Sequence, residues 1–518
     1  MMKRGYNIRV NLRINPNKSA FMNKYYVTTT LPYVNSEPHI GFALEIVRAD
    51  ALARLASLRG EEVIFNTGTD EHGLKIHRKA LEQGISTQEY VDGYAKKFKD
   101  LKELLNLSFT NFIRTTDEHH KKAAQEFWKR CDANGDIYKK TYKVKYCVGC
   151  ELEKTDSELV DDKCPIHPTY EIELIDEENY FFKFSAYQEK LLKLYEQKDF
   201  VIPEHRQNEI KAFVERGLQD FSISRLKEKM PWGVEVPGDE TQVMYVWFDA
   251  LVNYISTLGW PEDKKNFNDF WPGVQLAGKD NLRQQSAMWQ AMLMSANLPN
   301  SKQVFIGGHI MSEGQKMSKS IGNVIAPFEV VEKYGVDAVR YFLLGGLSAY
   351  GDGDWSEERF ENFYTAHLVN GIGNLTSRIL TMIEKYQENK VPAVAVDIFE
   401  TEKFWLDYES AFAKFDFEEV VKNINSLVSK IDLKISEEKP WEKVKTGEDI
   451  SVLLYQLVEG LRHLALSLVP IIPGTAEKIL SQLNLEVSDN FAEEKKWGLL
   501  QEGKEIKKAD ILFVRLEK

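Results

Sequence analysis

Three cysteines and one histidine with the spacing of a metal site lie close together in the chain. Cys147 and Cys150 are separated by two residues, and Cys164 and His167 repeat that gap. Two tight pairs can bring three thiolates and one imidazole to the corners of a tetrahedron, which is a ligand set that Zn²⁺ prefers, and a site closed by four protein ligands is structural. The alternative is a chance grouping of turn residues, but the repeated gap favours one structural Zn²⁺ on a zinc knuckle (147–167).

A pair of lysines in the stretch EGQKMSKSIGN could act on phosphate. Lys316 and Lys319 are three positions apart, and Gly314 and Gly322 flank them. Glycines would let this loop move, and mobile lysines can neutralise the charge of a transferring phosphate. The alternative is a solvated connector between two strands, and the stretch alone does not decide between the two.

Two further loops and one aromatic pair have side chains suited to small ligands. His39 precedes a helix that Gly41 opens, so it could donate to a phosphate at the helix N-terminus or simply cap the helix. Asp70, in TGTDEHG, could hold the amino group of a ligand or cap a helix. Trp247 and Tyr254 are seven positions apart, two helical turns, and could share a face, although such pairs are more often core residues than ligand contacts.

These loops follow short β-rich runs at 24–30, 62–68, 274–278 and 303–308, and helical patterns lie between the runs. Alternation of strand, loop and helix predicts an α/β fold with a doubly wound parallel sheet of Rossmann type. In such sheets ligands bind at the carboxyl ends of the strands. We therefore expect the loops to converge on one site.

The remainder of the chain divides into an insertion and a helical region. The alternation lapses between roughly 135 and 230, and hydrophobic residues repeat at threes and fours after about 365, which predicts a C-terminal α-helical bundle. The expected segments are a basic, disordered N-terminal extension (1–22), the first half of the catalytic domain (23–134), the insertion (135–230), the second half (231–305), the lysine-loop region (306–364) and the bundle (365–518).

Polar groups on the bundle could contact nucleic acid. Asn370, Asn374 and Arg378 follow one another at intervals of four and form one polar strip. Trp441 follows a proline and is predicted to lie outside a helix, where it could stack on a base. The alternatives are ordinary surface for the strip and a tertiary anchor for the tryptophan.

Composition narrows the class of protein. The chain has 518 residues, a formal net charge of -12 and no apolar run near the roughly 18 residues that span a bilayer. With a negative net charge, the protein has no overall positive field to attract nucleic acid, so any binding would depend on a local basic surface. Residues 1–22 have five basic groups and no acid, as in a transit peptide, but we favour a disordered tail or an upstream start codon. Four cysteines make no disulfide framework, which indicates a reducing compartment, and we expect the cytoplasm.

Together these motifs resemble the class I aminoacyl-tRNA synthetases. The His-Ile-Gly turn and the Lys-Met-Ser-Lys-Ser loop, 277 positions apart (316 minus 39), are similar to the two signatures of that class. Further motifs match the methionyl-tRNA synthetase family: TTTLPYVN, TGTDEHG, the zinc knuckle, YVWFDA, GKD, GNLTSR and a late PW. The resemblance covers about residues 23–518, and the shared set is more specific than any single motif.

The resemblance implies an ATP-dependent methionine–tRNA ligase (EC 6.1.1.10). Such an enzyme makes methionyl-adenylate and pyrophosphate from methionine and Mg²⁺-bound ATP, and then passes the methionyl group to the 3'-terminal adenosine of tRNA(Met). The resemblance assigns catalysis to His39, Lys316 and Lys319, and ATP binding to these three with Gly41, Glu235 and Asp280. It assigns methionine binding to Leu31, Tyr33, Asp70, Trp247, Tyr254 and Gln285. It assigns anticodon binding to Asn374, Arg378 and Trp441. The region 306–364 would include a stem-contact element.

Three residues depart from the family pattern. Phe42 stands where the class usually has a second histidine, and Gln284 and Gln285 replace an aromatic residue and a histidine beside the methionine pocket. We expect altered pocket contacts rather than lost function. The alternatives are a catalytically weakened tRNA-binding paralogue, and a class I ligase for another apolar amino acid, which is disfavoured because no large editing insertion is present. No further domain follows the bundle, so a monomer is expected.

Overall fold

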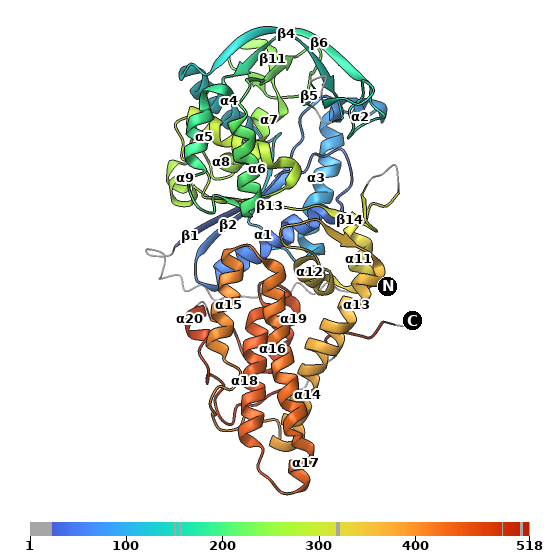
Figure 1. Cartoon of the computed structure of the whole chain (residues 1–518), viewed down its shortest axis with the longest axis vertical. Coiled ribbons are helices and arrows are strands. Elements are labelled where there is room, and N and C mark those ends of the chain that lie inside the picture. The colour runs from blue at the N-terminus through green and yellow to red at the C-terminus, as the bar shows by residue number, and fades with distance from the viewer. Residues whose placement is uncertain are drawn as a thin grey trace.

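The computed structural model describes residues 23–149, 152–154, 158–317, 322–488, 490–507 and 511–516. An α/β part and a helical part are stacked along the long axis of the molecule (Figure 1). The N-terminal extension 1–22, Cys150 and Lys319 lie outside the described residues.

A six-stranded sheet forms the centre of the α/β part. Its spatial order is β3 (Asn111–Arg114), β2 (Glu62–Thr69), β1 (Lys24–Thr29), β12 (Val274–Gly278), β13 (Gln303–Gly307) and β7 (Val201–Ile202). Every neighbouring pair is parallel, which confirms the predicted doubly wound sheet. The strand order changes direction between β1 and β12, and this is the switch point at which ligands bind in such sheets.

The helix α1 (Ile40–Leu58) follows β1 and is buried along most of its length. It contacts β1 and β2 of the sheet and also α12 (Val336–Gly345), so few of its side chains reach water. This explains why the apolar residues of α1 are not confined to one stripe.

The insertion forms a long antiparallel hairpin at the top of the molecule in Figure 1. In it β4 (Ile137–Cys147) pairs with β6 (Ile172–Phe182) over eleven residue pairs, and β5 (Leu152–Lys154) and β8 (Phe221–Ser222) flank them. Within the span expected for the insertion, β7 pairs with β13, so residues 201–202 lie in the six-stranded sheet.

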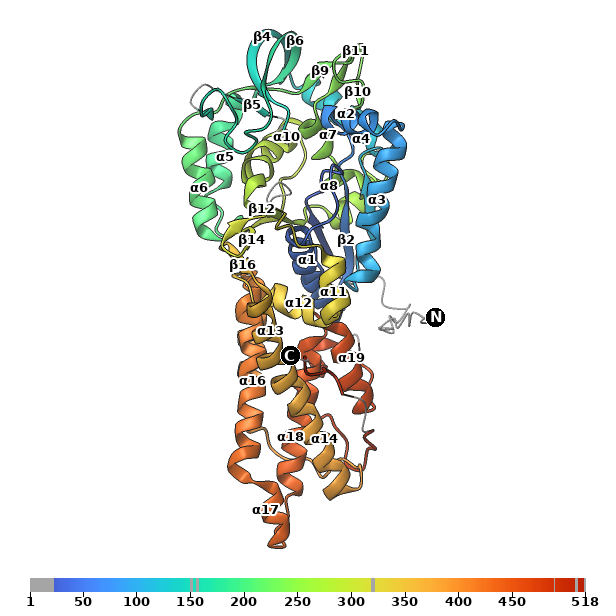
Figure 2. The ribbon, with the colours of Figure 1, turned by 90° about the vertical axis from the view of Figure 1, so that its right-hand side faces the viewer.

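The helical part is built mainly from long helices that run along the axis of the molecule (Figures 1 and 2). They are α14 (Asn374–Gln387), α15 (Thr401–Ala413), α16 (Phe417–Glu438) and α18 (Ser451–Leu468), with α19 (Pro473–Gln482) at the end near the sheet. Every residue of α18 from 453 to 468 is buried, including the ion-paired Glu459 and Arg462. None of the helices in the described part of the chain is long and apolar enough to span a membrane.

Candidate active site

The loops that follow β1 and β2 are joined at the carboxyl edge of the sheet. The backbone N–H of Val34 donates to the carbonyl oxygen of Asp70 (3.1 Å), and the N–H of Asp70 donates to that of Pro32 (3.0 Å). Tyr33 and Asp70 form an isolated parallel bridge. These bonds extend the sheet by one step and hold the buried Asp70 beside Tyr33.

The histidine turn and the lysine loop are distant in sequence but adjacent in space. The N–H of Ile40 donates to the carbonyl oxygen of Ile325 (3.0 Å), and a Cβ on Gly41 would lie 3.8 Å from Met317 Cε. Through Nδ1, His39 accepts a hydrogen bond from the N–H of Gly41 (3.1 Å), so it does cap the helix. Its ring is exposed, so capping is compatible with a ligand contact.

The lysine loop starts from a short hairpin. The strand β15 (Gln315–Lys316) pairs with β14 (Ile310–Ser312), and Gly314 between them has a φ of 73° that favours glycine. Gly322 beyond the lysines has a φ of 74°. The backbone of Lys316 belongs to this hairpin, and Lys319 lies outside the described residues.

An aromatic cluster lies beside the Asp70 loop. Tyr33 and Trp247 pack against Tyr146, Val148 and Tyr245. The buried indole Nε1 of Trp247 has no hydrogen-bond partner among the described residues. A buried donor without a partner is costly, and a bound ligand or an ordered water would satisfy it.

Tyr254 and Gln285 meet behind this cluster. The Nε2 of Gln285 donates to the hydroxyl of Tyr254, and both side chains are buried. The Oε1 of Gln285 has no partner within the described residues. Trp247 and Tyr254 do not lie on one helix as predicted, because α7 (Val246–Ala250) ends before α8 (Asn253–Ser256) begins.

Phe42 points into the core and not toward the cleft. Its side chain is 9% exposed, and its ring packs edge-on against Phe98 of α3 (Thr87–Leu104) with centroids 5.4 Å apart. A phenylalanine is therefore well accommodated in this direction. Because the surroundings of this side chain are apolar, the replacement of the family's second histidine by Phe42 leaves no buried polar group without a partner.

Leu31, Asp280 and Glu235 are the remaining side chains predicted to bind the small ligands. Leu31 is half-buried in the turn after β1. Asp280 is exposed after β12, where His309 Nε2 lies 3.4 Å from its Oδ1. Glu235 pairs with Lys227 (2.5 Å) on β10 (Glu235–Val236).

The metal ligands that the structure describes converge as predicted. One sulfur each from Cys147 and Cys164 and one ring nitrogen of His167 all lie within 4.8 Å of one another. A Cβ on Gly149 would lie 2.5 Å from His167 Cγ, so a glycine is required where the knuckle closes. Two thiolates and one imidazole at this separation fit a Zn²⁺ ion. The fourth predicted ligand, Cys150, lies outside the described residues.

Comparison with known proteins agrees with this geometry. A family model described as "tRNA synthetases class I (M)" matches residues 25–173 and 155–380. The methionine–tRNA ligase of Caldanaerobacter subterraneus subsp. tengcongensis is 42% identical over 507 residues, which cover 95% of this chain and 79% of that protein. That of Thermosynechococcus vestitus is 40% identical and covers 95% of this chain and 97% of its own.

A solved structure is similar over nearly the same span. Mycobacterium tuberculosis methionyl-tRNA synthetase in complex with methionyl-adenylate superimposes with a TM-score of 0.90 at 35% identity, covering 95% of this chain and all of that one. The chain belongs to the methionine–tRNA ligase family. The ligase is thus an ATP-dependent aminoacyl-tRNA ligase (EC 6.1.1.10), and the identification from motif order is confirmed.

One acidic residue in the cleft of the ligase escapes sequence reasoning. Glu45 lies on α1, and its Oε1 accepts hydrogen bonds from the backbone N–H (2.8 Å) and the hydroxyl (2.6 Å) of Thr30. Burial raises the pKa of Glu45 to about 8, and the carboxylate of Asp280 adds to the rise, against the lowering effect of the Thr30 hydrogen bonds. The signal in the sequence is a single acid between Leu44 and Ile46, in an apolar stretch that opens at the histidine turn.

The predicted anticodon residues of the ligase lie along the helical part. Asn374 is exposed at the start of α14, and Arg378 one turn later pairs with Asp432 of α16. Trp441 is 40% exposed on α17 (Pro440–Lys445) at the far tip of the bundle. The prediction that Trp441 lies outside a helix is wrong, because Pro440 occupies the first turn of α17, where its missing N–H costs nothing.

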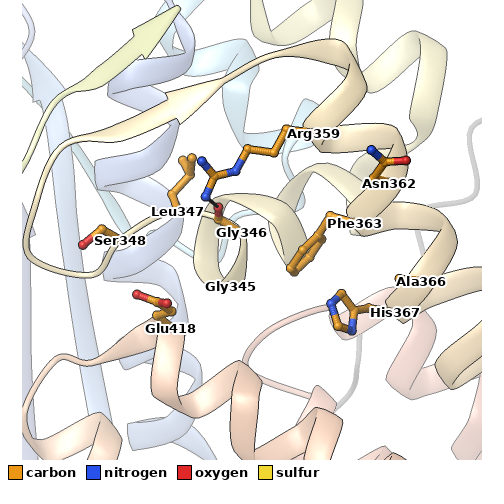
Figure 3. Close-up of a pocket in the computed structure, with 10 residues that line it drawn as sticks. All are labelled: Gly345, Gly346, Leu347, Ser348, Arg359, Asn362, Phe363, Ala366, His367 and Glu418. Atoms are coloured by element: carbon orange, nitrogen blue, oxygen red, sulfur yellow. Dashed lines mark hydrogen bonds between the residues drawn. The ribbon is translucent and has the colours of Figure 1, made fainter. Parts of the chain in front are cut away.

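A groove of about 490 Å³ lies between the two parts of the ligase (Figure 3). Its floor is the end of α12 with Gly345 and Gly346, and its walls include Arg359, His367 and Glu418. Arg359 donates through Nη2 to the carbonyl oxygen of Gly346 (2.9 Å). The wall is the start of one continuous helical run, α13 (Glu357–Phe363), a π-helical segment (Tyr364–Gly373) and α14.

Proposed function

We propose that the ligase activates methionine with ATP at the carboxyl edge of its sheet, and that the residues of the cleft have the roles implied by the family resemblance. The observation that carries this proposal is the backbone bond between Ile40 and Ile325, which joins the histidine turn to the far side of the lysine loop (3.0 Å). A phosphate between turn and loop would face the N-terminus of α1 and the lysines together.

Methionine occupies the pocket beside Asp70. The carboxylate of Asp70 holds the ammonium group, while Leu31, Tyr33, Trp247 and Tyr254 enclose the side chain. Methionine is unbranched and polarizable, and sulfur–aromatic contacts are favourable, so an aromatic lining suits it. The unpartnered Oε1 of Gln285 and Nε1 of Trp247 support a polar contact with the ligand or an ordered water.

ATP occupies the space over the switch point. His39 and Gly41 contact the phosphates and adenine, Lys316 and Lys319 clamp the leaving pyrophosphate with Mg²⁺, and Asp280 and Glu235 hold the adenosine. The methionine carboxylate attacks the α-phosphorus in line, and pyrophosphate leaves. This step requires placement and charge neutralisation more than covalent help from the protein.

The decisive experiment is ATP–pyrophosphate exchange with each of the twenty amino acids. Exchange with methionine alone is expected. Exchange with leucine or valine would instead support a ligase for another apolar amino acid. No exchange with any amino acid would support a weakened tRNA-binding paralogue.

In the second step the methionyl group passes to the terminal adenosine of tRNA(Met). Asn374, Arg378 and Trp441 read the CAU anticodon. The helical run from the groove to α14 supports a path for the tRNA along the molecule, because it carries Arg359 at the groove and Arg378 on α14. Cationic side chains along such a path would contact the phosphate backbone.

We expect about one Zn²⁺ per chain, bound by Cys147, Cys150, Cys164 and His167. Metal analysis of protein purified without chelator measures this directly. Cys164→Ser is expected to lose the zinc, whereas Cys131→Ala, a buried cysteine outside the knuckle, is expected to keep it. Metal-free wild-type protein would refute the site.

The ionisation of Glu45 is expected to weaken ATP binding at high pH. Below about pH 8 the carboxyl is protonated and neutral; above it, Glu45 adds a negative charge next to Asp280, where ATP binds. The KM for ATP should therefore rise as the pH passes about 8. Glu45→Gln, which mimics the neutral form, should remove this rise, and an identical profile in both proteins would contradict the assignment.

The cysteines also support a reducing compartment, for which we propose the cytoplasm. Among the described residues, Cys131, Cys147 and Cys164 form no disulfide. Structural disulfides are rare in the cytosol. A monomer stays a prediction, which light scattering would test.

A further inference from the structure

Four buried polar side chains form a connected network behind the methionine pocket. His72 Nδ1 lies 2.8 Å from Asp249 Oδ2, and His120 Nε2 lies 3.5 Å from Asp249 Oδ1. His120 Nδ1 lies 2.9 Å from the hydroxyl of Ser256. All four side chains belong to residues that are at most 2% exposed.

The members of this network come from the elements that carry the pocket. His72, Asp249 and Ser256 each lie two positions after a proposed methionine-binding residue, namely Asp70, Trp247 and Tyr254. His120 lies in the first turn of α4 (Glu118–Ala133). The network therefore ties the loop after β2 to α7 and α8 through one carboxylate.

The hydrogen-bond roles follow from the chemistry of Asp249. Burial raises its pKa, but His72 and His120 outweigh that effect and hold the pKa below its ordinary value. An ionised carboxylate only accepts, so His72 Nδ1 and His120 Nε2 both carry a proton toward it. Ser256 then donates to His120 Nδ1, and the roles are consistent throughout the network.

The backbone around His72 is held from the opposite side. The indole N–H of Trp232 donates to the carbonyl oxygen of Glu71 (2.6 Å), and the N–H of Gly73 donates to that of Trp232 (3.1 Å). The rings of His72 and Trp232 meet edge to face at 5.9 Å. The hydrogen bond to Asp249 is thus the connection that sets this loop relative to α7.

We propose that the His72–Asp249–His120 network is a positioning device that fixes Asp70 relative to Trp247 and thereby sets the affinity for methionine. His72 and Asp249 are positioning residues, since they act through their neighbours. The inference rests on the proposed function, which assigns Asp70 and Trp247 to methionine. A displacement of about 1 Å in such a site is enough to cost a large factor in rate or affinity.

Steady-state exchange kinetics test this inference. His72→Leu is expected to raise the KM for methionine about tenfold, equivalent to about 1.4 kcal/mol, while the KM for ATP stays within about twofold. His72→Asn, whose amide nitrogen can occupy the position of Nδ1, is expected to restore the methionine KM to within about twofold of wild type. His77→Leu is the matched control, because His77 bonds Thr87 (2.9 Å) on the outer side of the same segment and should change neither KM.

Three results would overturn the inference: an unchanged methionine KM in His72→Leu, equal rises in both KM values, or no restoration by His72→Asn. If His72→Leu does not fold, Asp249→Asn decides, since it keeps the shape but removes the charge; a higher methionine KM supports the network and an unchanged one refutes it. Asp70→Asn separates this test from the proposed function. If Asp70→Asn keeps a normal methionine KM, the assignment of the pocket fails. If Asp70→Asn raises the methionine KM but His72→Leu does not, only the network is refuted.

Discussion

Asp70→Asn is expected to bind methionine about 100-fold more weakly than the wild-type ligase. Asp70 is 8% exposed, and its backbone is fixed by hydrogen bonds to the loop after β1, so the substitution removes charge without moving the chain. Loss of one partner of a buried, charged hydrogen bond costs about 2–5 kcal/mol, and about 2.7 kcal/mol is 100-fold in affinity. The methionine KM in ATP–pyrophosphate exchange measures this, and the KM for ATP should change little.

Asp92→Asn is the control for this prediction. Asp92 pairs with Arg114, and its side chain, on α3, is 51% exposed. The methionine KM of this variant should equal that of the wild type. A normal methionine KM in Asp70→Asn would mean that another group holds the ammonium.

Local sequence patterns were sufficient to predict the elements that carry the site. The runs that became β1, β2, β12 and β13 are long enough to show β-rich composition, and each is followed by a loop with unusual side chains. Parallel strands bring such loops to one edge, so the meeting of the β1 and β2 loops follows from the fold class. The contact between Ile40 and Ile325 spans 285 positions (325 minus 40), and it fits the expectation that loops at the carboxyl edge of the sheet converge on one site.

Short elements and local breaks were beyond the sequence patterns. The strand β7 has only two residues, too few for any periodicity, so its membership in the sheet depends on β13. The break between α7 and α8 depends on Asn253, whose side chain donates to the carbonyl oxygen of Ala250 (2.7 Å) and competes with the helix backbone. Trp247 and Tyr254, although seven positions apart in the sequence, therefore lie on two different helices.

The environment of a buried charge is also a property of the fold. Glu45 and Asp50 lie on the same helix, five positions apart, yet the fold treats them in opposite ways. Glu45 accepts hydrogen bonds from Thr30, and burial raises its pKa to about 8. Asp50 pairs with Arg54 on the same helix and with Arg340 on α12, and these two arginines stabilise its charged form.

Asp50→Asn is expected to destabilise the folded ligase by about 3–5 kcal/mol. Asp50 Oδ2 lies 2.7 Å from Arg340 Nη2 and 2.7 Å from Arg54 Nε, and the Asp50 and Arg340 side chains are fully buried. Arg340 also donates to the carbonyl oxygens of Pro470 and Ile471, so the pair joins α1 to the bundle. Removal of the carboxylate leaves the Arg340 guanidinium buried without its counter-ion, which is the costly way to break such a pair.

Scanning calorimetry measures this prediction, and the thermal midpoint should fall by about 3–5 °C. Asp100→Asn is the matched control, because Asp100 pairs with Lys96 on the surface (2.8 Å) and should not shift the midpoint.

The sign of the pH dependence of this stability difference gives a second check. Burial raises the pKa of Asp50, but Arg54 and Arg340 hold it below its ordinary value. Its contribution is therefore complete above the unfolded pKa of about 4 and is lost as the pH falls through the folded value. The stability difference between wild type and Asp50→Asn should shrink on acidification, and a constant difference would contradict an ionised Asp50.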